Sequence, residues 1–305
     1  MSAHVNMDAT NRQAPSSSTR WEPRVSARRA VGEIWRWLLF AATALAIVLL
    51  GMLLWSIIEP GWDWLSWHLI TDMPSRKPEI AGMNSGIWGS IWIVIGSAIF
   101  SFVVGVGTAI YLEEYAPRNR LTRMIQTNIS NLAGVPSIVY GLLGLVFFVQ
   151  WMNLGRSISA GALTMGLLIL PVVVISSQEA VRAVPLGLRQ ASYALGATKW
   201  QTIRHHVLPS AMPGILTGMI LSMSRAIGET APLLVVGASS LVLSRPDGPL
   251  SPFTAMPVQI YNWSARPQKE FEHLTAAAII VLLIVLISMN ALAIYLRQRL
   301  SRNRM

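Results

Sequence analysis

The sequence contains no cysteine, and this absence excludes several kinds of site. Without a thiol there can be no disulfide, no thiolate nucleophile and no cysteine-based zinc site. The five histidines are scattered along the chain rather than clustered as metal ligands are. We therefore expect no metal, no other cofactor and no catalytic residue in this chain.

Lysine is scarce as well. The chain has only Lys77, Lys199 and Lys269, and none of them follows a glycine. A phosphate-binding loop of the Walker A type requires Gly-Lys followed by Ser or Thr, so it is excluded here. We expect that the chain is not an enzyme. If ATP drives its activity, ATP must be hydrolysed on a partner chain.

Charged residues make up only 12% of the chain, whereas 53% of its residues are hydrophobic. Soluble domains carry about 25% charged residues, so lipid is the expected solvent. The net charge of +10 is compatible with nucleic-acid binding. Basic loops that flank apolar spans produce the same excess, and we therefore expect membrane lipid and no nucleic acid as a partner.

Six apolar runs are each close to the length of about 20 residues that a helix needs to cross a bilayer. They predict an all-α polytopic membrane protein with six transmembrane helices. Small residues recur in the second to fourth runs, where they allow close helix packing in lipid, and the first run looks peripheral. The expected spans are Trp37–Ile58, Ile87–Leu112, Ile125–Val149, Ile158–Ser177, Pro213–Gly237 and Leu274–Leu296.

These spans divide the chain into four regions. We predict a disordered cytoplasmic tail over residues 1–33, and a first transmembrane helix with an external loop over 34–84. A core of five helices follows over 85–296, with a cytoplasmic coupling segment at 179–209, and a basic cytoplasmic tail at 297–305 ends the chain.

The basic residues predict the orientation of the chain. Seventeen Lys or Arg residues fall in the two tails and in the loops that share their side, against six in the opposite loops. By the positive-inside rule both termini are cytoplasmic, in a multi-pass protein of the cell membrane. Tryptophans near the outer loops would then anchor the chain at the interface: Trp62, Trp64, Trp67, Trp88, Trp92, Trp151 and Trp263.

The longest cytoplasmic loop between two spans, Glu179–Pro209, carries an apolar stripe. Leu188, Ala191 and Leu195 recur at the spacing of one helix face. A helical segment outside the bilayer indicates that this face docks onto another protein. The alternative is an amphipathic stretch that lies on the lipid headgroups.

Local signals predict a helix–turn–helix in this loop. Gly196 stands where a helix C-cap favours a residue free to adopt positive φ. Thr198, followed three residues later by Gln201, is the signature of a capping box that opens a second helix. Pro209 and Pro213 are expected to break the chain before the fifth span.

The same loop resembles the EAA loop of ABC importer permeases, whose pattern is E-A-A-x3-G-x9-I-x-L-P. Ala191, Gly196, Leu208 and Pro209 match this pattern. Gln190, Ser192 and His206 replace its Glu, second Ala and Ile, and Gln190 removes a charge that would pair with an ATPase. The resemblance implies that Gln190, Ala191, Ser192, Gly196, Leu208 and Pro209 couple the chain to an ATPase subunit.

Two opposite charges lie inside the fifth apolar run. Arg225 is at the midpoint of Pro213–Gly237, and Glu229 follows four residues later on the same helix face. Charged residues in a span are costly and usually functional. A guanidinium can bind a tetrahedral oxyanion with two parallel donors, while Glu229 would orient it. The structural alternative is a self-neutralising pair that holds helices together. Pro232, one turn later, would let the helix unwind locally.

Two longer motifs resemble phosphate importer permeases of the PstA type. They are Gly134-Val-Pro-Ser-Ile-Val-Tyr-Gly141 and Ser224-Arg-Ala-Ile-Gly-Glu-Thr-Ala-Pro232. The resemblance covers about residues 85–296 and implies the type I ABC importer fold, with Arg225, Glu229 and Thr230 in the substrate pathway. It also implies a second permease (PstC-like), an ATPase dimer (PstB-like) and an external phosphate-binding protein (PstS-like).

Other functions remain open at this stage. The chain could be a permease for another oxyanion or small solute. It could be a secondary transporter or a channel without an ATPase, although no second copy of the Arg225 motif supports an inverted repeat. A signalling or assembly protein is favoured only if Arg225 and Glu229 prove replaceable.

Overall fold

The structure is a computed structural model that describes residues 25–238, 242 and 244–302. The chain divides into two compact units, Met1–Leu54 and Trp55–Met305. The described part is helical, and its only β-type pairing is an isolated bridge between Ser157 and Pro252. Residues 1–24, which belong to the expected N-terminal tail, and residues 303–305 lie outside the described residues.

The helices follow the apolar runs but extend beyond them. The α-helices are α1 (Val25–Gly61), α2 (Trp67–Thr71), α3 (Asn84–Ile110), α4 (Arg120–Leu132), α5 (Ser137–Gly144), α6 (Ile158–Arg182), α7 (Leu186–Ala194), α8 (Lys199–Thr202), α9 (Leu208–Ile227), α10 (Ala231–Val236), α11 (Met256–Ser264) and α12 (Lys269–Arg302). Two 3₁₀ turns are η1 (Trp62–Trp64) and η2 (Pro78–Ile80). Three π-helical segments are η3 (Tyr111–Tyr115), η4 (Leu145–Trp151) and η5 (Ile203–Val207).

The described residues of the first unit, 25–54, belong to α1, whose last residues reach into the second unit. This helix begins at Val25, so residues 25–33 belong to a helix and not to the disordered tail expected from the sequence. The helical segment Val31–Trp64 is long and apolar enough to span a membrane. At the other end of the chain α12 runs to Arg302, well into the segment expected to be a tail.

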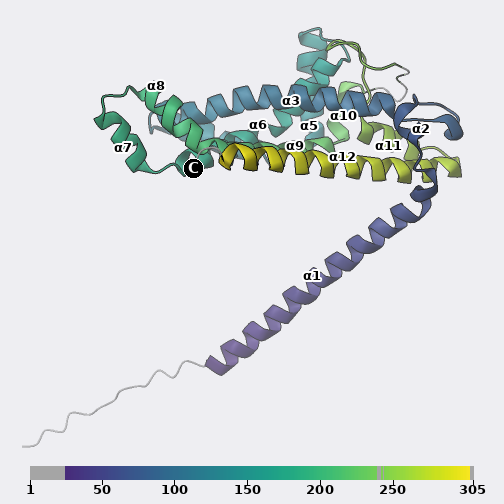
Figure 1. The fold of residues 1–305 in the computed structure, drawn as a ribbon, viewed down its shortest axis with the longest axis horizontal. Coiled ribbons are helices and arrows are strands. Elements are labelled where there is room, and N and C mark those ends of the chain that lie inside the picture. The colour runs from purple at the N-terminus through teal and green to yellow at the C-terminus, as the bar shows by residue number, and fades with distance from the viewer. Residues whose placement is uncertain (1–24, 239–241, 243, 303–305) are drawn as a thin grey trace, which may run out of the picture. The chain divides into compact units, whose positions relative to one another are not determined.

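In the second unit α3, α6, α9 and α12 run lengthwise (Figure 1). The most extensive helix–helix contact joins α3 and α6. Glycine makes it close, since a Cβ at Gly105 would lie 2.8 Å from Val173 Cγ1 and one at Gly96 would lie 2.8 Å from Ala162 Cβ. Small residues therefore permit the close packing that the sequence predicts.

Among the residues that the structure describes, five helices are long and apolar enough to span a membrane, and a bent pair of helices brings the total to as many as six. The bent pair corrects the third expected span. Residues Ile125–Val149 do not form one straight helix, because α4 and the α5–η4 segment meet at 105°. The physical reason is Gly134-Val135-Pro136: a proline disfavours helical backbone in the residue before it, and Pro136 itself has an extended ψ of 137°.

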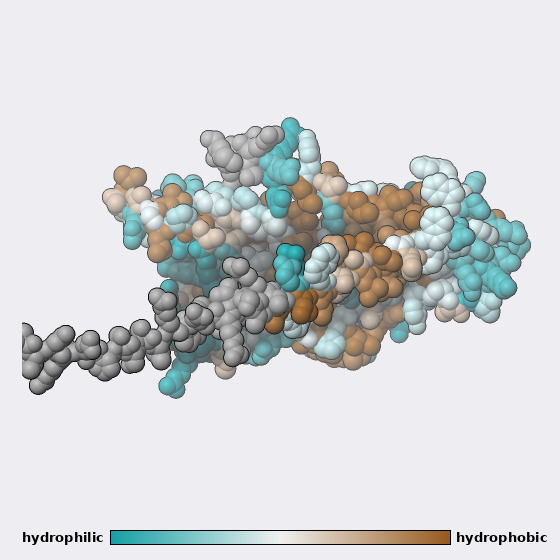
Figure 2. Space-filling view, turned by 90° about the horizontal axis from the view of Figure 1, so that it is seen from below, coloured by the Kyte–Doolittle hydropathy of each residue, from teal (hydrophilic) through white to brown (hydrophobic). Residues whose placement is uncertain are grey.

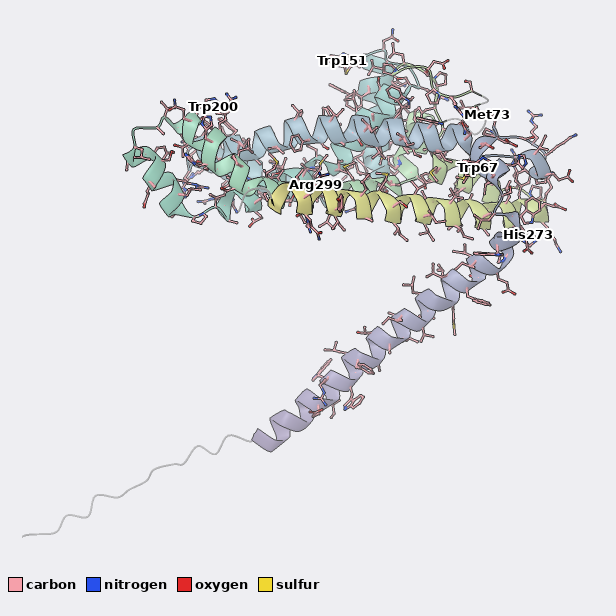
Figure 3. The ribbon with its side chains drawn as sticks, in the orientation of Figure 1. Trp67, Met73, Trp151, Trp200, His273 and Arg299 are labelled. Carbon is pink, nitrogen blue, oxygen red and sulfur yellow. The ribbon has the colours of Figure 1, made fainter. Side chains whose placement is uncertain are left out.

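The two ends of the second unit differ in character. One end carries α7, α8 and the C-terminal end of α12, and the opposite end carries α2 (Figure 1). Apolar side chains cover much of the surface along the helices, and hydrophilic ones gather at the α2 end (Figure 2). Trp67 and His273 lie at the α2 end and Trp200 at the other (Figure 3). Trp263 is 2% exposed and packs in the core, so its expected role as an interfacial anchor is wrong.

Candidate functional site: the broken fifth span and the coupling elbow

The fifth expected span is interrupted beside the charged pair. Helix α9 ends at Ile227, and α10 begins at Ala231 with Pro232 in its first turn. Arg225, at the midpoint of the expected span Pro213–Gly237, therefore lies in the last turn of α9. Proline has no N–H to continue the helix and its ring crowds the preceding turn, which explains the break. The local unwinding expected from Pro232 is confirmed.

Arg225 and Glu229 lie close together across this break. Arg225 Nε is 3.6 Å from Glu229 Oε1, and the two side chains are 62% and 20% exposed. The Glu229 N–H donates to the Ala226 carbonyl over 3.1 Å, which keeps the carboxylate near the end of α9. A cation at a helix C-terminus is also favoured by the helix dipole. The result is a guanidinium that is oriented on one side by Glu229 and is open on the other.

Thr230 is the N-cap residue of α10. Its carbonyl accepts from the Leu234 N–H over 3.1 Å, and its half-buried side chain makes no capping hydrogen bond. The Thr230 side chain is therefore not used to cap the helix that follows it.

The two motifs shared with phosphate importer permeases meet in space, although about 90 residues separate them. A Cβ at Gly141 would lie 2.8 Å from Pro232 Cα, so α5 and α10 touch through a glycine. Tyr140 and Ala226 lie in one buried cluster, and Val135 packs against that cluster. The Tyr140 hydroxyl donates to the Leu132 carbonyl over 2.8 Å, bridging the bend between α4 and α5. The bend and the break are thus parts of one packed region.

We call residues 186–202, which comprise α7, the turn at Gly196 and α8, the elbow. Gly196 has φ of +80°, as the sequence predicts. The Ala197 N–H donates to the Ser192 carbonyl and the Gly196 N–H to the Tyr193 carbonyl, which together form a Schellman motif. Both hydrogen bonds of the predicted capping box between Thr198 and Gln201 are present. The two-helix prediction for this loop is confirmed.

The outer face of the elbow is apolar and uncovered in the isolated chain. Leu195 is 89% exposed and Leu188 is 37% exposed, and Gln190 and Ala191 lie beside them on the surface. Exposed leucines at helical spacing form a surface that another protein can cover.

Three of the expected coupling residues are not on that face. Ser192 is 4% exposed, and its hydroxyl is 2.8 Å from the Thr202 hydroxyl. This hydrogen bond joins α7 to α8 in the interior of the elbow. Leu208 and Pro209 are half-buried where the elbow joins α9, and Leu208 packs against a buried cluster. Leu208 and Pro209 therefore lie where they can fix the position of the elbow relative to α9.

The expectation that Pro209 and Pro213 break the chain before the fifth span is wrong. Helical structure continues from Lys199 to Ile227. The π-helical segment η5 ends directly before Leu208, and its wider turn accommodates the proline ring that follows. The Pro213 carbonyl accepts from the Thr217 hydroxyl over 2.7 Å.

Metal binding has no support in the part of the chain that the structure describes, where no group of three or more His, Asp or Glu side chains could hold an ion.

Comparison with known proteins identifies the family. Residues 101–302 match the family described as "Binding-protein-dependent transport system inner membrane component", which is more than half of the chain. The chain belongs to this family. It is a permease component of an ABC transporter, and members of this family work with an ATPase and an external binding protein.

Relatives with curated names agree with this membership. The chain is 33% identical over 312 residues to "Phosphate transport system permease protein PstA 1" of Mycobacterium tuberculosis, covering 100% of this chain and 99% of that protein. It is 35% identical to "Phosphate transport system permease protein PstA" of Mycobacterium leprae, covering 92% and 93%. "Probable ABC transporter permease protein YqgI" of Bacillus subtilis is 38% identical over 63% of this chain and 65% of its own length.

Solved structures confirm the fold of this permease. A subunit of a bacterial ABC transporter involved in the import of the acidic polysaccharide alginate superposes with a TM-score of 0.61 at 17% identity, covering 89% of this chain and 99% of that one. The MetNI methionine ABC transporter gives 0.60 at 19% identity, covering 72% and 95%. At this identity the likeness concerns the fold alone, which is that of type I ABC importer permeases.

Sequence reasoning missed polar residues that tie α9 of the permease to α12. The Ser224 hydroxyl donates to Asn290 Oδ1, and Arg297 Nη1 donates to the Thr217 hydroxyl over 2.9 Å. The sequence does indicate a role for Asn290, because it is an isolated amide in the apolar run Leu274–Leu296, where polar side chains form hydrogen bonds between helices. These contacts hold the helix that carries Arg225.

Proposed function

We propose that this permease is one subunit of an ATP-driven importer of inorganic phosphate and forms half of its translocation pathway. In this assembly a PstC-like permease supplies the other half, a PstB-like ATPase dimer hydrolyses ATP, and a PstS-like external protein delivers phosphate. Similarity over nearly the whole chain to relatives named as phosphate transport permeases supports the substrate.

The observation that carries the proposal is the open guanidinium of Arg225. Its side chain is 62% exposed in the isolated chain, although it lies in an otherwise apolar helix. A charge that served only as a staple would be expected to bury against its partner. A planar guanidinium suits a tetrahedral oxyanion because two N–H groups can donate in parallel to two oxygens.

Glu229 and Thr230 complete the proposed site. Glu229, 3.6 Å from Arg225, orients the guanidinium and limits how tightly it holds an anion, because a nearby carboxylate repels phosphate. The Thr230 hydroxyl is a neutral donor at the same break, and it makes no capping hydrogen bond. Because Arg225 attracts phosphate and Glu229 repels it, the site binds the anion weakly enough to release it.

The elbow is the proposed contact with the ATPase. Exposed Leu188, Ala191 and Leu195 supply an apolar surface, and Gln190 supplies a neutral polar group beside them. We infer that this end and both termini are cytoplasmic, because the basic residues favour that side. The C-terminal end of α12 lies at the elbow end, which is consistent with this orientation (Figure 1).

Reconstitution tests the proposal. The permease is co-expressed with a PstC-like permease, a PstB-like ATPase and a PstS-like binding protein, and the purified complex is placed in lipid vesicles. We expect ATP-dependent uptake of labelled phosphate, and co-purification of the ATPase that Leu195→Asp weakens while Leu250→Asp, at an exposed leucine of the segment before α11, does not.

Three results would contradict the proposal. Uptake that persists without ATP would indicate a secondary transporter. Uptake of sulfate in place of phosphate would indicate a permease for another oxyanion. Equal ATPase co-purification by both leucine variants would remove the elbow as the docking surface.

A further inference from the structure

Three consecutive residues of η3, the π-helical segment that follows α3, contact three different helices at the elbow. Glu113 accepts two hydrogen bonds from Arg182, the last residue of α6, from Nη2 over 2.6 Å and from Nε over 2.9 Å. Glu114 Oε1 lies 3.2 Å from Arg189 Nη2 in α7. The Tyr115 ring lies 4.9 Å from Lys199 Nζ, which begins α8. Both helices of the elbow are therefore tied to η3.

The π-helical geometry of η3 makes this arrangement accessible. The Ala116 N–H donates to the Tyr111 carbonyl over 2.8 Å, one residue further back than in an α-helix. A π turn holds more residues than an α turn, so the direct neighbours Glu113 and Glu114 diverge by a smaller angle about the helix axis than they would in an α-helix. Their partners Arg182 and Arg189 can then lie on adjoining sides of the segment. Leu112, which is 6% exposed, anchors the segment in the bundle.

The contact between Glu114 and Arg189 is the buried member of the set. Their side chains are 7% and 18% exposed. Arg189 Nη2 also donates to the Val181 carbonyl near the end of α6 over 2.7 Å. A single side chain of the elbow therefore reaches both α6 and η3, which continues α3, and α3 and α6 share the most extensive helix–helix contact. Surface ion pairs are loosely held, whereas a buried pair fixes the positions of the groups that it joins.

We propose that Glu114 and Arg189 are positioning residues through which a displacement of the elbow moves α3 and α6 together. Lys199 and Tyr115 serve the second helix of the elbow in the same way. This inference rests on the proposed function, in which a separate ATPase subunit moves the elbow. It assigns a transmitting role to η3, a segment outside both the anion site and the docking surface.

The test measures coupling rather than binding. The complex in vesicles is assayed for ATP hydrolysis and for phosphate uptake, and the quantity compared is phosphate moved per ATP hydrolysed. The main variant is Glu114→Gln with Arg189→Gln, which removes the pair without leaving a buried charge. The control is Glu33→Gln with Arg36→Gln, an exposed ion pair on α1. We expect the main variant to lower the ratio by about tenfold with ATPase co-purification unchanged, and the control to leave it unchanged.

A merely structural role gives a different result. It would lower membrane level, co-purification and both activities in proportion, and that outcome, or an unchanged ratio, would overturn the inference. Should the double variant not reach the membrane, Tyr115→Leu decides on the same criterion, because that side chain is exposed. Wild-type complex without ATP-dependent uptake would instead refute the proposed function, before any variant is compared.

Discussion

Replacing Arg225 is predicted to have a small effect on the stability of the protein and a large effect on phosphate transport. Arg225 Nε lies 3.6 Å from Glu229 Oε1, and the Arg225 side chain is 62% exposed. Exposed ion pairs four residues apart contribute about 0.3–0.5 kcal/mol. The favourable position at the helix C-terminus adds about 0.3–1 kcal/mol. Arg225→Gln should therefore lower the free energy of unfolding by about 1 kcal/mol, which is too little to prevent folding.

The expected effect on transport is much larger. A hydrogen bond to a charged group contributes about 1.5–3 kcal/mol, so loss of the guanidinium should lower phosphate uptake by roughly 10- to 150-fold. Arg225→Lys should restore part of the uptake, since an ammonium is a point charge without the planar fork. Glu229→Gln should be milder for entry and should slow release, because the freed guanidinium holds phosphate longer.

The assay compares initial uptake rates of labelled phosphate in vesicles at matched membrane levels, together with thermal unfolding in detergent. The double variant Arg225→Gln with Glu229→Gln distinguishes the two roles of the pair. If Arg225 acts on the substrate, this variant inserts and unfolds like the wild type yet stays inactive. Uptake near the wild-type level in the double variant would refute the reasoning and would show that the pair is only a structural staple.

Other predictions test the elbow, the orientation and the packing. Gly196→Ala should cost about 1–2 kcal/mol in the elbow and weaken ATPase co-purification, because alanine resists positive φ, whereas Gly187→Ala in α7 should not. Equal ATPase co-purification with the Gly196→Ala and Gly187→Ala variants would show that the positive φ at Gly196 is not needed for docking. Lys269→Cys, in a chain without other cysteines, should react with an impermeant reagent in intact cells, and reaction only after permeabilisation would reverse the orientation. Gly141→Ala should lower stability by about 1–3 kcal/mol, because its Cβ would meet Pro232, while Gly107→Ala, with open space around it, should not, and thermal unfolding in detergent compares the two.

Local rules predicted the elbow and the apolar runs predicted the helices, because both depend on residues close in sequence. Gly196 and the Thr198–Gln201 capping box needed no tertiary information. The bend at Pro136 also had a local signal, but the apolar run on both sides favoured one continuous helix. The break after Ile227 was anticipated only as local unwinding, because Pro232 marks where the helix is weakened but not the residue at which it ends.

Contacts between residues that are far apart along the chain could not be predicted from the sequence. Nothing in the spacing of Gly141 and Pro232 indicates that they touch. Ser192 matches a motif position, yet the direction of its side chain into the elbow depends on Thr202, ten residues away. The ion pairs of Glu113 and Glu114 were missed for the same reason, since their partners lie about 70 residues further along the chain.

The close contact between α3 and α6 has a consequence for the way this sequence can change over time. At Gly105 even one added methyl group would meet Val173, and at Gly96 it would meet Ala162. Gly107 lies on the same helix but has open space around it, so a methyl group there meets nothing. Substitutions should therefore accumulate at Gly107 in related sequences, while Gly96 and Gly105 stay fixed.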